Sequence, residues 1–196
     1  MPTPAAKTRN TTKRLSILLF LIGTGVACTN LGMVGGIFTH PDLGYTIPGP
    51  NGLDGDEVPV WRAMDVKRTD LAFRGPGDAY LAISSHCDET VTDPAILARQ
   101  LLVGLKQRER VSSERFEFAG GQAYRQTIES ILDDTPLRTR TVTLVRADCV
   151  VDWALVAKKE TEGLDSTFDL WWQSFDPGAM PGSASVAVEA PDEVTQ

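Results

Sequence analysis

The chain has 196 residues, and its 26 acidic residues against 19 basic ones give a formal net charge of −7. An acidic chain lacks the electrostatic footprint of a nucleic-acid-binding protein, so we expect no nucleic-acid partner. Its three cysteines and two histidines provide little material for a metal site.

The N-terminal 27 residues have the pattern of an export signal. Four basic residues between positions 7 and 14 precede an uncharged, mostly apolar stretch at 15–26 that ends at small residues. A positive start followed by an apolar stretch of roughly 7 to 15 residues is typical of a secretory signal. Without these four residues, 15 basic residues remain against 26 acidic ones, a formal charge of about −11. Such a charge discourages attachment to anionic lipid, so membrane contact should come from an anchor.

The segment Gly25-Val26-Ala27-Cys28 resembles the lipobox of bacterial lipoproteins, although Gly25 stands where that family usually has leucine. The resemblance implies that residues 1–27 are a cleaved signal peptide and that Cys28 is acylated and becomes the new N-terminus. It therefore implies a protein of the bacterial cell envelope that is anchored by lipid and faces the periplasm. Thr29 resembles the choice that sorts lipoproteins of enteric bacteria to the outer membrane, which favours that membrane over the inner one.

Two alternatives to the lipid anchor remain open. No charged residue occurs from Leu15 to Phe38, and these 24 residues could cross about 30 Å of hydrocarbon as an uncleaved helix. Asn30 and five glycines in the stretch argue against that helix. Plain secretion after cleavage is the second alternative.

Cys87 and Cys149 remain when Cys28 carries lipid, and two thiols in an oxidising compartment form a natural disulfide pair. Closing a loop of this length would stabilise the fold by on the order of 4 kcal/mol in the chain-entropy model. Two separate buried thiols are the alternative. A metal site is not expected, because neither cysteine belongs to a CxxC pair and the only histidines are His40 and His86.

Three zones follow the signal. Residues 28–59 are rich in glycine and proline without sustained periodicity, which predicts an irregular, lipid-anchored tether. Residues 60–175 have the length of one domain with a single core. Residues 176–196 are small and acidic, which predicts a disordered tail.

Within 60–175 the patterns alternate between strands and helices. Asp93-Pro94 offers a helix N-cap, and leucines at 97, 101 and 105 predict a helix that ends near Arg110. Alternating runs and turns predict a hairpin and a four-stranded meander, and aromatic residues at helical spacing predict a closing helix. These elements are expected at 70–73, 78–85, 115–118, 122–132, 137–146, 149–157 and 164–175. The order predicts an α+β fold, with an antiparallel sheet of about six or seven strands covered by two main helices.

This order of elements resembles the fold of the photosystem protein PsbP and of the bacterial lipoproteins that share it. The resemblance covers residues 63–175 and rests on the topology, on the stretch from Phe116 to Ala123 and on the aromatic final helix. It implies a PsbP-like sandwich that serves as a binding or assembly domain without chemistry of its own. No functional residue carries over by motif.

Motifs for catalysis or cofactor binding are absent from the sequence: there is no GxSxG, HExxH, GxxxxGK[ST] or GxGxxG pattern. Ser84 and His86 would share one face of a strand and Ser85 the other, which we interpret as a polar strand end. Asp148 is interpreted as a turn residue and Asp152 as a solvated or hydrogen-bonded partner of a nearby base. We therefore expect neither an enzyme nor a cofactor.

Trp171 and Trp172 are neighbours in the expected closing helix, and neighbouring side chains on a helix differ by about 100°. One of the two is expected to lie at the rim of the core and to mark a protein contact.

The sequence therefore predicts a membrane-anchored envelope lipoprotein that acts as a non-catalytic binding or assembly module with an envelope protein as its partner. One alternative is an accessory solute-binding component of an envelope transport system, which predicts an apolar cavity. The other is a small hydrolase, which requires a cleft that contains His86 or a pair of perturbed carboxylates.

Overall fold

The computed structural model describes residues 32–51, 53, 61–87, 93–159 and 163–182. It contains two helices, a short 3-10 turn and ten strands within these residues. In chain order they are β1 (Met33–Val34), β2 (Ile37–Thr39), β3 (Thr46–Pro48), β4 (Arg62–Met64), β5 (Leu71–Arg74), η1 (Pro76–Asp78), β6 (Tyr80–Cys87), α1 (Pro94–Gln100), β7 (Lys106–Phe118), β8 (Gly121–Leu132), β9 (Thr135–Arg146), β10 (Cys149–Lys158) and α2 (Leu164–Gln173).

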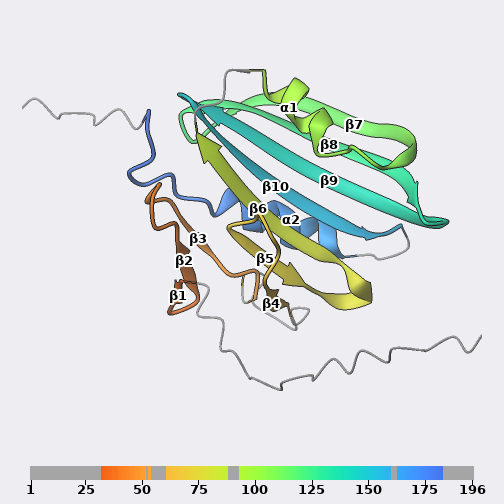
Figure 1. Ribbon diagram of the computed structural model, residues 1–196, viewed down its shortest axis with the longest axis horizontal. Helices are drawn as coiled ribbons and strands as arrows, with labels where there is room; N and C mark the ends of the chain where they lie inside the picture. Colours follow the sequence, from red (N-terminus) through yellow and green to blue (C-terminus); the bar gives the residue numbers. More distant parts are fainter. Residues whose placement is uncertain (1–31, 52, 54–60, 88–92, 160–162, 183–196) are drawn as a thin grey trace, which may run out of the picture.

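The larger sheet has seven antiparallel strands in the order β4-β5-β6-β10-β9-β8-β7, and β1-β2-β3 form a separate small sheet (Figure 1). The predicted α+β class and strand number are confirmed. The meander from β7 to β10 is continuous because each strand alternates its side chains and each connection is a short hairpin. Asp133 and Asp134 close the hairpin between β8 and β9 with φ of 47° and 62°, a left-handed conformation that aspartate tolerates.

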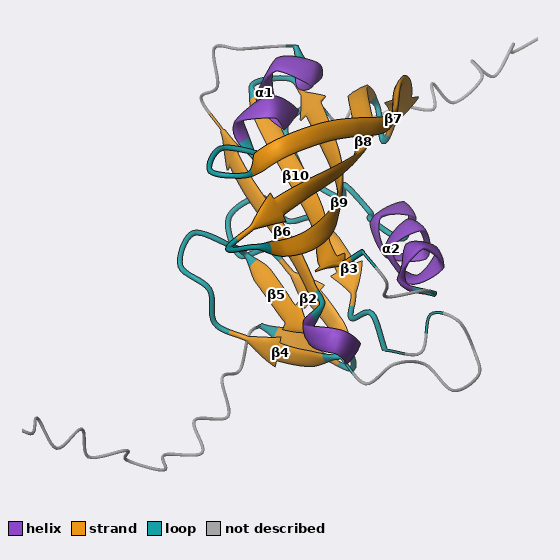
Figure 2. Cartoon of the chain, turned by 90° about the vertical axis from the view of Figure 1, so that its right-hand side faces the viewer, coloured by secondary structure: helices purple, strands orange, loops and turns teal. Residues whose placement is uncertain are grey.

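The two helices cover opposite faces of the larger sheet (Figure 2). Tyr124 packs against α1, whereas its neighbour Ala123 belongs to the main core with α2. Val150 and Val151 divide in the same way. Successive side chains of a strand point to opposite faces, so this division follows directly from the alternation.

Helix α1 is shorter than predicted. The expected N-cap is present, since the Asp93 carboxylate accepts a hydrogen bond from the Ala95 backbone N–H at 2.8 Å. The helix ends at Gln100 and not near Arg110, and Gly104 then has a φ of 96°. From Lys106 the chain pairs with β8 as a strand, so the leucine spacing extended the prediction too far.

The segment predicted as an irregular tether at 28–59 is part of the fold over much of its length. Phe38, Tyr45 and Ile47 are buried in the main core. Thr46 forms a β-bridge with Asp176 beyond α2, with N–O distances of 2.8 and 2.9 Å. Very short strands leave no periodicity in the sequence, and their apolar side chains become buried only against residues far along the chain.

The folded unit also continues past the predicted boundary at 175, because Met180 is buried in the core. Residues 183–196 of the predicted tail lie outside the described residues, as do the signal peptide at 1–27 and the lipidation site Cys28. Neither α1 nor α2, the helices of the described part, is long and apolar enough to span a membrane.

Candidate functional site

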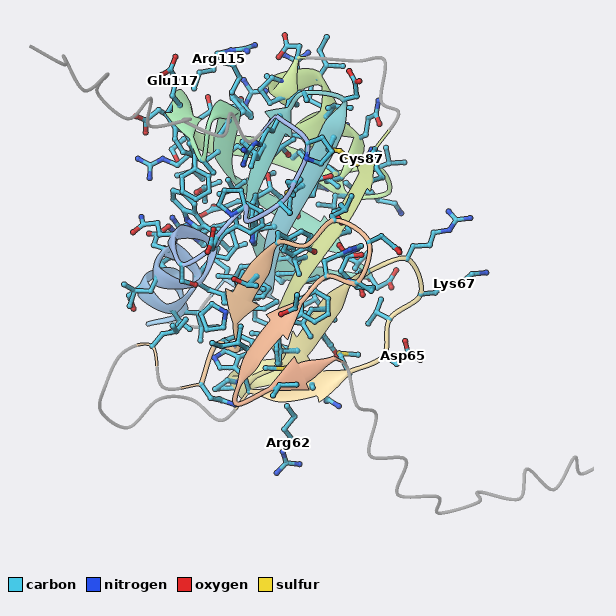
Figure 3. All side chains as sticks on the ribbon, turned by 90° about the vertical axis from the view of Figure 1, so that its left-hand side faces the viewer. Arg62, Asp65, Lys67, Cys87, Arg115 and Glu117 are labelled. Carbon is cyan, nitrogen blue, oxygen red and sulfur yellow. A yellow bond between two sulfur atoms is a disulfide. The ribbon has the colours of Figure 1, made fainter. Side chains whose placement is uncertain are left out.

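The disulfide predicted between Cys87 and Cys149 is present, with an S–S distance of 2.00 Å (Figure 3). The two cysteines are directly opposite each other where β6 pairs with β10. The same register places Ser84 opposite Asp152. Side chains directly opposite in an antiparallel pair have Cβ atoms roughly 4.5–5.5 Å apart, so the pairing brings together residues that lie far apart in the sequence.

Asp152 is an ionisable residue in the interior of the sheet. It is 8% exposed, and the Thr143 hydroxyl donates a hydrogen bond of 2.6 Å to its Oδ1. Burial raises its pKa from 3.8 to about 6, while this hydrogen bond and the nearby His86 act in the opposite direction. Desolvation therefore outweighs the polar contacts that favour the charged form.

A cleft of about 500 Å³ opens above Asp152 on the α1 side of the sheet. Its walls come from three places: the turn before β5, the end of β6, and the C-terminal half of α1. The lining side chains include Arg68, Asp70, Ser84, His86, Leu97 and Leu101. The volume falls within the range typical of small-molecule sites.

Asp70 connects this cleft to the small N-terminal sheet. Its Oδ2 accepts hydrogen bonds from the Tyr45 hydroxyl at 2.8 Å and the Ser85 hydroxyl at 2.6 Å. His40 Nε2 lies 3.6 Å from Oδ1, while its Nδ1 accepts the Asp42 backbone N–H. Burial, followed by the charge of Asp70, raises the pKa of Tyr45. The network holds the small sheet against one wall of the cleft.

The cleft contains His86, which the hydrolase alternative required. The Ser85 hydroxyl, however, donates to Asp70, and Ser85 lies on the opposite face of β6 from His86. Across the described residues no group of three or more His, Cys, Asp or Glu side chains could hold a metal ion. What the cleft offers chemically is the buried carboxylate of Asp152, a second carboxylate at Asp70, the basic side chains of Arg68 and His86, hydroxyl groups and apolar leucines.

The prediction that Trp171 or Trp172 is partly exposed was wrong, because they are 0% and 4% exposed. The Trp171 indole N–H donates to the Pro48 carbonyl at 2.9 Å. The Trp172 ring packs against Phe116 and Phe118, with centroid distances of 5.5 and 5.0 Å. The N-terminal segment therefore contacts one tryptophan and β7 covers the other.

A second feature is the surface formed by α1 and β7, here called the α1–β7 surface. β7 is an edge of the larger sheet, and it is exposed along most of its length. Arg115 and Glu117 project outward from it in Figure 3. Large apolar and basic side chains are exposed together on this surface: Ile96, Leu101, Val103 and Val111 with Arg99, Arg108 and Arg110. A hollow lined by residues of both elements makes the surface continuous.

Sequence reasoning considered Asp152 but interpreted it as a solvated or hydrogen-bonded partner of a nearby base. The signal for its burial was present, since Asp152 is the one charged residue between Cys149 and Ala157. Its neighbours on both faces of the strand are apolar. A lone carboxylate in such a strand indicates either a satisfied internal partner or a site.

No protein-family model and no curated protein sequence matches the chain. The solved structures that are similar in fold include the following two. The solution structure of cyanobacterial PsbP (CyanoP) from Synechocystis sp. PCC 6803 is 19% identical over 71% of this chain and 89% of that chain, with a TM-score of 0.53. The crystal structure of LpqN, involved in cell envelope biogenesis of Mycobacterium tuberculosis, is 14% identical over 71% and 88%, with a TM-score of 0.52. The predicted PsbP-like fold is therefore confirmed.

Proposed function

We propose that this protein is a lipid-anchored, non-catalytic binding or assembly module of the bacterial cell envelope, facing the periplasm. The lipobox-like segment that ends at Cys28 supports the anchor. The Cys87–Cys149 disulfide supports an oxidising compartment. LpqN, which shares the fold, is described as involved in cell envelope biogenesis, and this agrees with the proposed address.

The observation that carries the assembly role is the α1–β7 surface. Val103 is 81% exposed, and it lies beside Arg108 and Arg110 in the same hollow. Exposed apolar side chains gathered with arginine are typical of protein contacts. Arg99, Arg108 and Arg110 line this hollow with no acidic side chain among its lining residues, which favours a partner that presents apolar and acidic groups.

Site-specific crosslinking in living cells tests this role. A photoreactive residue at position 103 of the full-length protein is expected to give one reproducible adduct, which Arg110→Glu abolishes by reversing a charge of the surface. The matched control places the photoreactive residue at Val34, which is 82% exposed on the small sheet. Equal adducts from both positions, or none from position 103, would remove the proposed contact surface.

The anchor is tested separately by intact-mass spectrometry of the membrane-extracted protein. The expected N-terminus is a diacylglycerol-modified Cys28. A chain that begins upstream of Cys28 would indicate an uncleaved helix, and an unmodified chain recovered outside the membrane would indicate plain secretion.

A solute-binding role is the second candidate, and the cleft above Asp152 favours it. The predicted cavity was apolar, whereas this cleft combines the apolar Leu97 and Leu101 with polar and charged side chains. This combination of apolar and charged side chains restricts the class of solute that the cleft can bind.

A further inference from the structure

Asp152 is a buried carboxylate, and the groups around it compensate its charge only in part. The nearby His86 lowers the pKa of Asp152 through its charge, but burial outweighs that effect. The surface carboxylates of Asp93 and Asp169, by contrast, each pair with an arginine at 2.9 Å. The hydroxyl of Thr143 is the donor on Oδ1. Burying a charge is costly unless it is paired, so an ionised Asp152 favours a cation that enters from the cleft.

The rest of the cleft determines which cation fits. Ser84 lies directly opposite Asp152, so its hydroxyl can accept a second hydrogen bond from a donor that reaches the carboxylate. Leu97 of α1 and Leu101, which follows the helix, provide an apolar part of the lining. This arrangement matches a molecule that has a small charged end and an apolar body.

A divalent metal ion suits the donor set less well. The described residues contain no group of three His, Cys, Asp or Glu side chains that could ligate it. Calcium and magnesium prefer several oxygen ligands, and one buried carboxylate does not provide them. A primary ammonium group needs only a few acceptors, and it forms charge-assisted hydrogen bonds with a carboxylate.

We infer that the cleft between α1 and β6 binds a small organic ammonium ion, with its charged group on Asp152 and its apolar part on Leu97 and Leu101. The inference does not depend on the lipid anchor, and the cleft shares Leu101 with the α1–β7 surface. It names small organic ammonium ions as the class of solute for the proposed solute-binding role.

Other charged groups also line the cleft and influence this binding. Arg68 and Asp70 come from the turn before β5, and His86 comes from β6. The lining residues of α1 and directly after it are Leu97, Gln100 and Leu101, which carry no charge. Protonation of Asp152 would remove the charge that attracts a cation, and the pH series below is therefore run in a variant that lacks His86.

Three probes of similar size distinguish the effect of ligand charge from that of ligand shape. They are benzylammonium, benzyl alcohol and benzoate. Each is titrated into the isotope-labelled full-length protein in mild detergent, and amide chemical shifts are followed by NMR. The expected result is that benzylammonium shifts the amides of Ser84, His86 and Leu97 with at least about tenfold higher affinity than either other probe. Equal affinities, or shifts confined to other regions, would overturn the inference.

Two variants and a pH series locate the charge. Asp152→Asn is expected to weaken benzylammonium binding by about tenfold or more, because it removes the buried charge without changing its shape. Asp148→Asn changes an exposed turn residue nearby and should have no effect. In His86→Gln protein the affinity should still fall about tenfold between about pH 7.5 and about pH 5, since Asp152 has a pKa of about 6. An unchanged affinity in Asp152→Asn, or a flat pH series in His86→Gln, contradicts the assignment.

Discussion

Asp152→Asn is expected to make the protein more stable at alkaline pH. In the folded chain burial raises the pKa of Asp152 from 3.8 to about 6, a difference of about two units. Each unit corresponds to about 1.4 kcal/mol, so keeping this side chain ionised in the folded state costs about 3 kcal/mol at pH 8. Asparagine has the same shape and no charge, and its side-chain oxygen can still accept the Thr143 hydroxyl.

The sign of the pH dependence follows from the raised pKa. The folded state binds the proton of Asp152 more tightly than the unfolded state does, so protonation favours folding. This contribution is complete below the unfolded value of 3.8 and is lost as the pH rises through about 6. The gain in stability from Asp152→Asn should therefore grow by about 2–3 kcal/mol between about pH 4 and about pH 8.

Urea unfolding of the full-length chain in mild detergent, followed by tryptophan fluorescence, measures this difference at several pH values. Asp148→Asn is the matched control, because Asp148 is exposed in the turn that precedes β10, and its effect should stay near zero. If the difference between Asp152→Asn and the native protein does not change with pH, or if the variant is less stable at pH 8, Asp152 is not a desolvated carboxylate.

Replacing both Cys87 and Cys149 by serine should lower the free energy of unfolding by on the order of 4 kcal/mol, because the bond closes a loop with a sequence separation of 62 residues. Urea titration measures the loss in the free energy of unfolding, and a loss below about 1 kcal/mol would contradict the loop-closure argument. Trp171→Ala should cost about 3–5 kcal/mol, whereas Leu170→Ala on the exposed side of α2 should cost little. Phe38→Ala should likewise cost about 3–5 kcal/mol in thermal unfolding; no effect would mean that the N-terminal sheet is not part of the cooperative unit.

The meander could be predicted because its strands are long and their pairing is local. Residues 122–132 and 137–146 alternate clearly, and the turn Asp133-Asp134 between them determines their register. The disulfide could be predicted from the number of cysteines and the expected compartment. In each case the decisive information lies within a few residues or in a simple count.

The N-terminal sheet and the burial of the tryptophans could not be predicted in this way. The longest strands of the small sheet have three residues, which is too short for a period to be recognised. Trp171 contacts Pro48, a separation of 123 residues, so its surroundings cannot be inferred from the sequence near it. One tryptophan was expected at the rim because neighbouring helix side chains differ by about 100°, and this local rule takes no account of a distant segment that covers the helix.

Asp152 is the position at which local rules and the native fold disagree most clearly. Elsewhere the carboxylates of Asp93, Glu114 and Asp169 form ion pairs at or near the surface, where water also solvates them. Asp152 is 8% exposed, and it accepts a hydrogen bond from the neutral hydroxyl of Thr143. An aliphatic or amide side chain would stabilise the same strand, and departures of this kind are expected at functional sites.

Asp152→Asn should therefore have two effects of opposite sign, one on the stability of the protein and one on ligand binding. The substitution should raise stability at pH 8, because it removes a buried charge that is compensated only in part, and weaken benzylammonium binding, because it removes the acceptor. A carboxylate with a purely structural role would lose stability when changed to asparagine, and it would not distinguish benzylammonium from benzyl alcohol. A stability gain without a loss of binding would mean that the Asp152 charge is buried but that benzylammonium does not bind to it. Measuring both in the same preparation therefore separates the electrostatic argument from the assignment of a ligand.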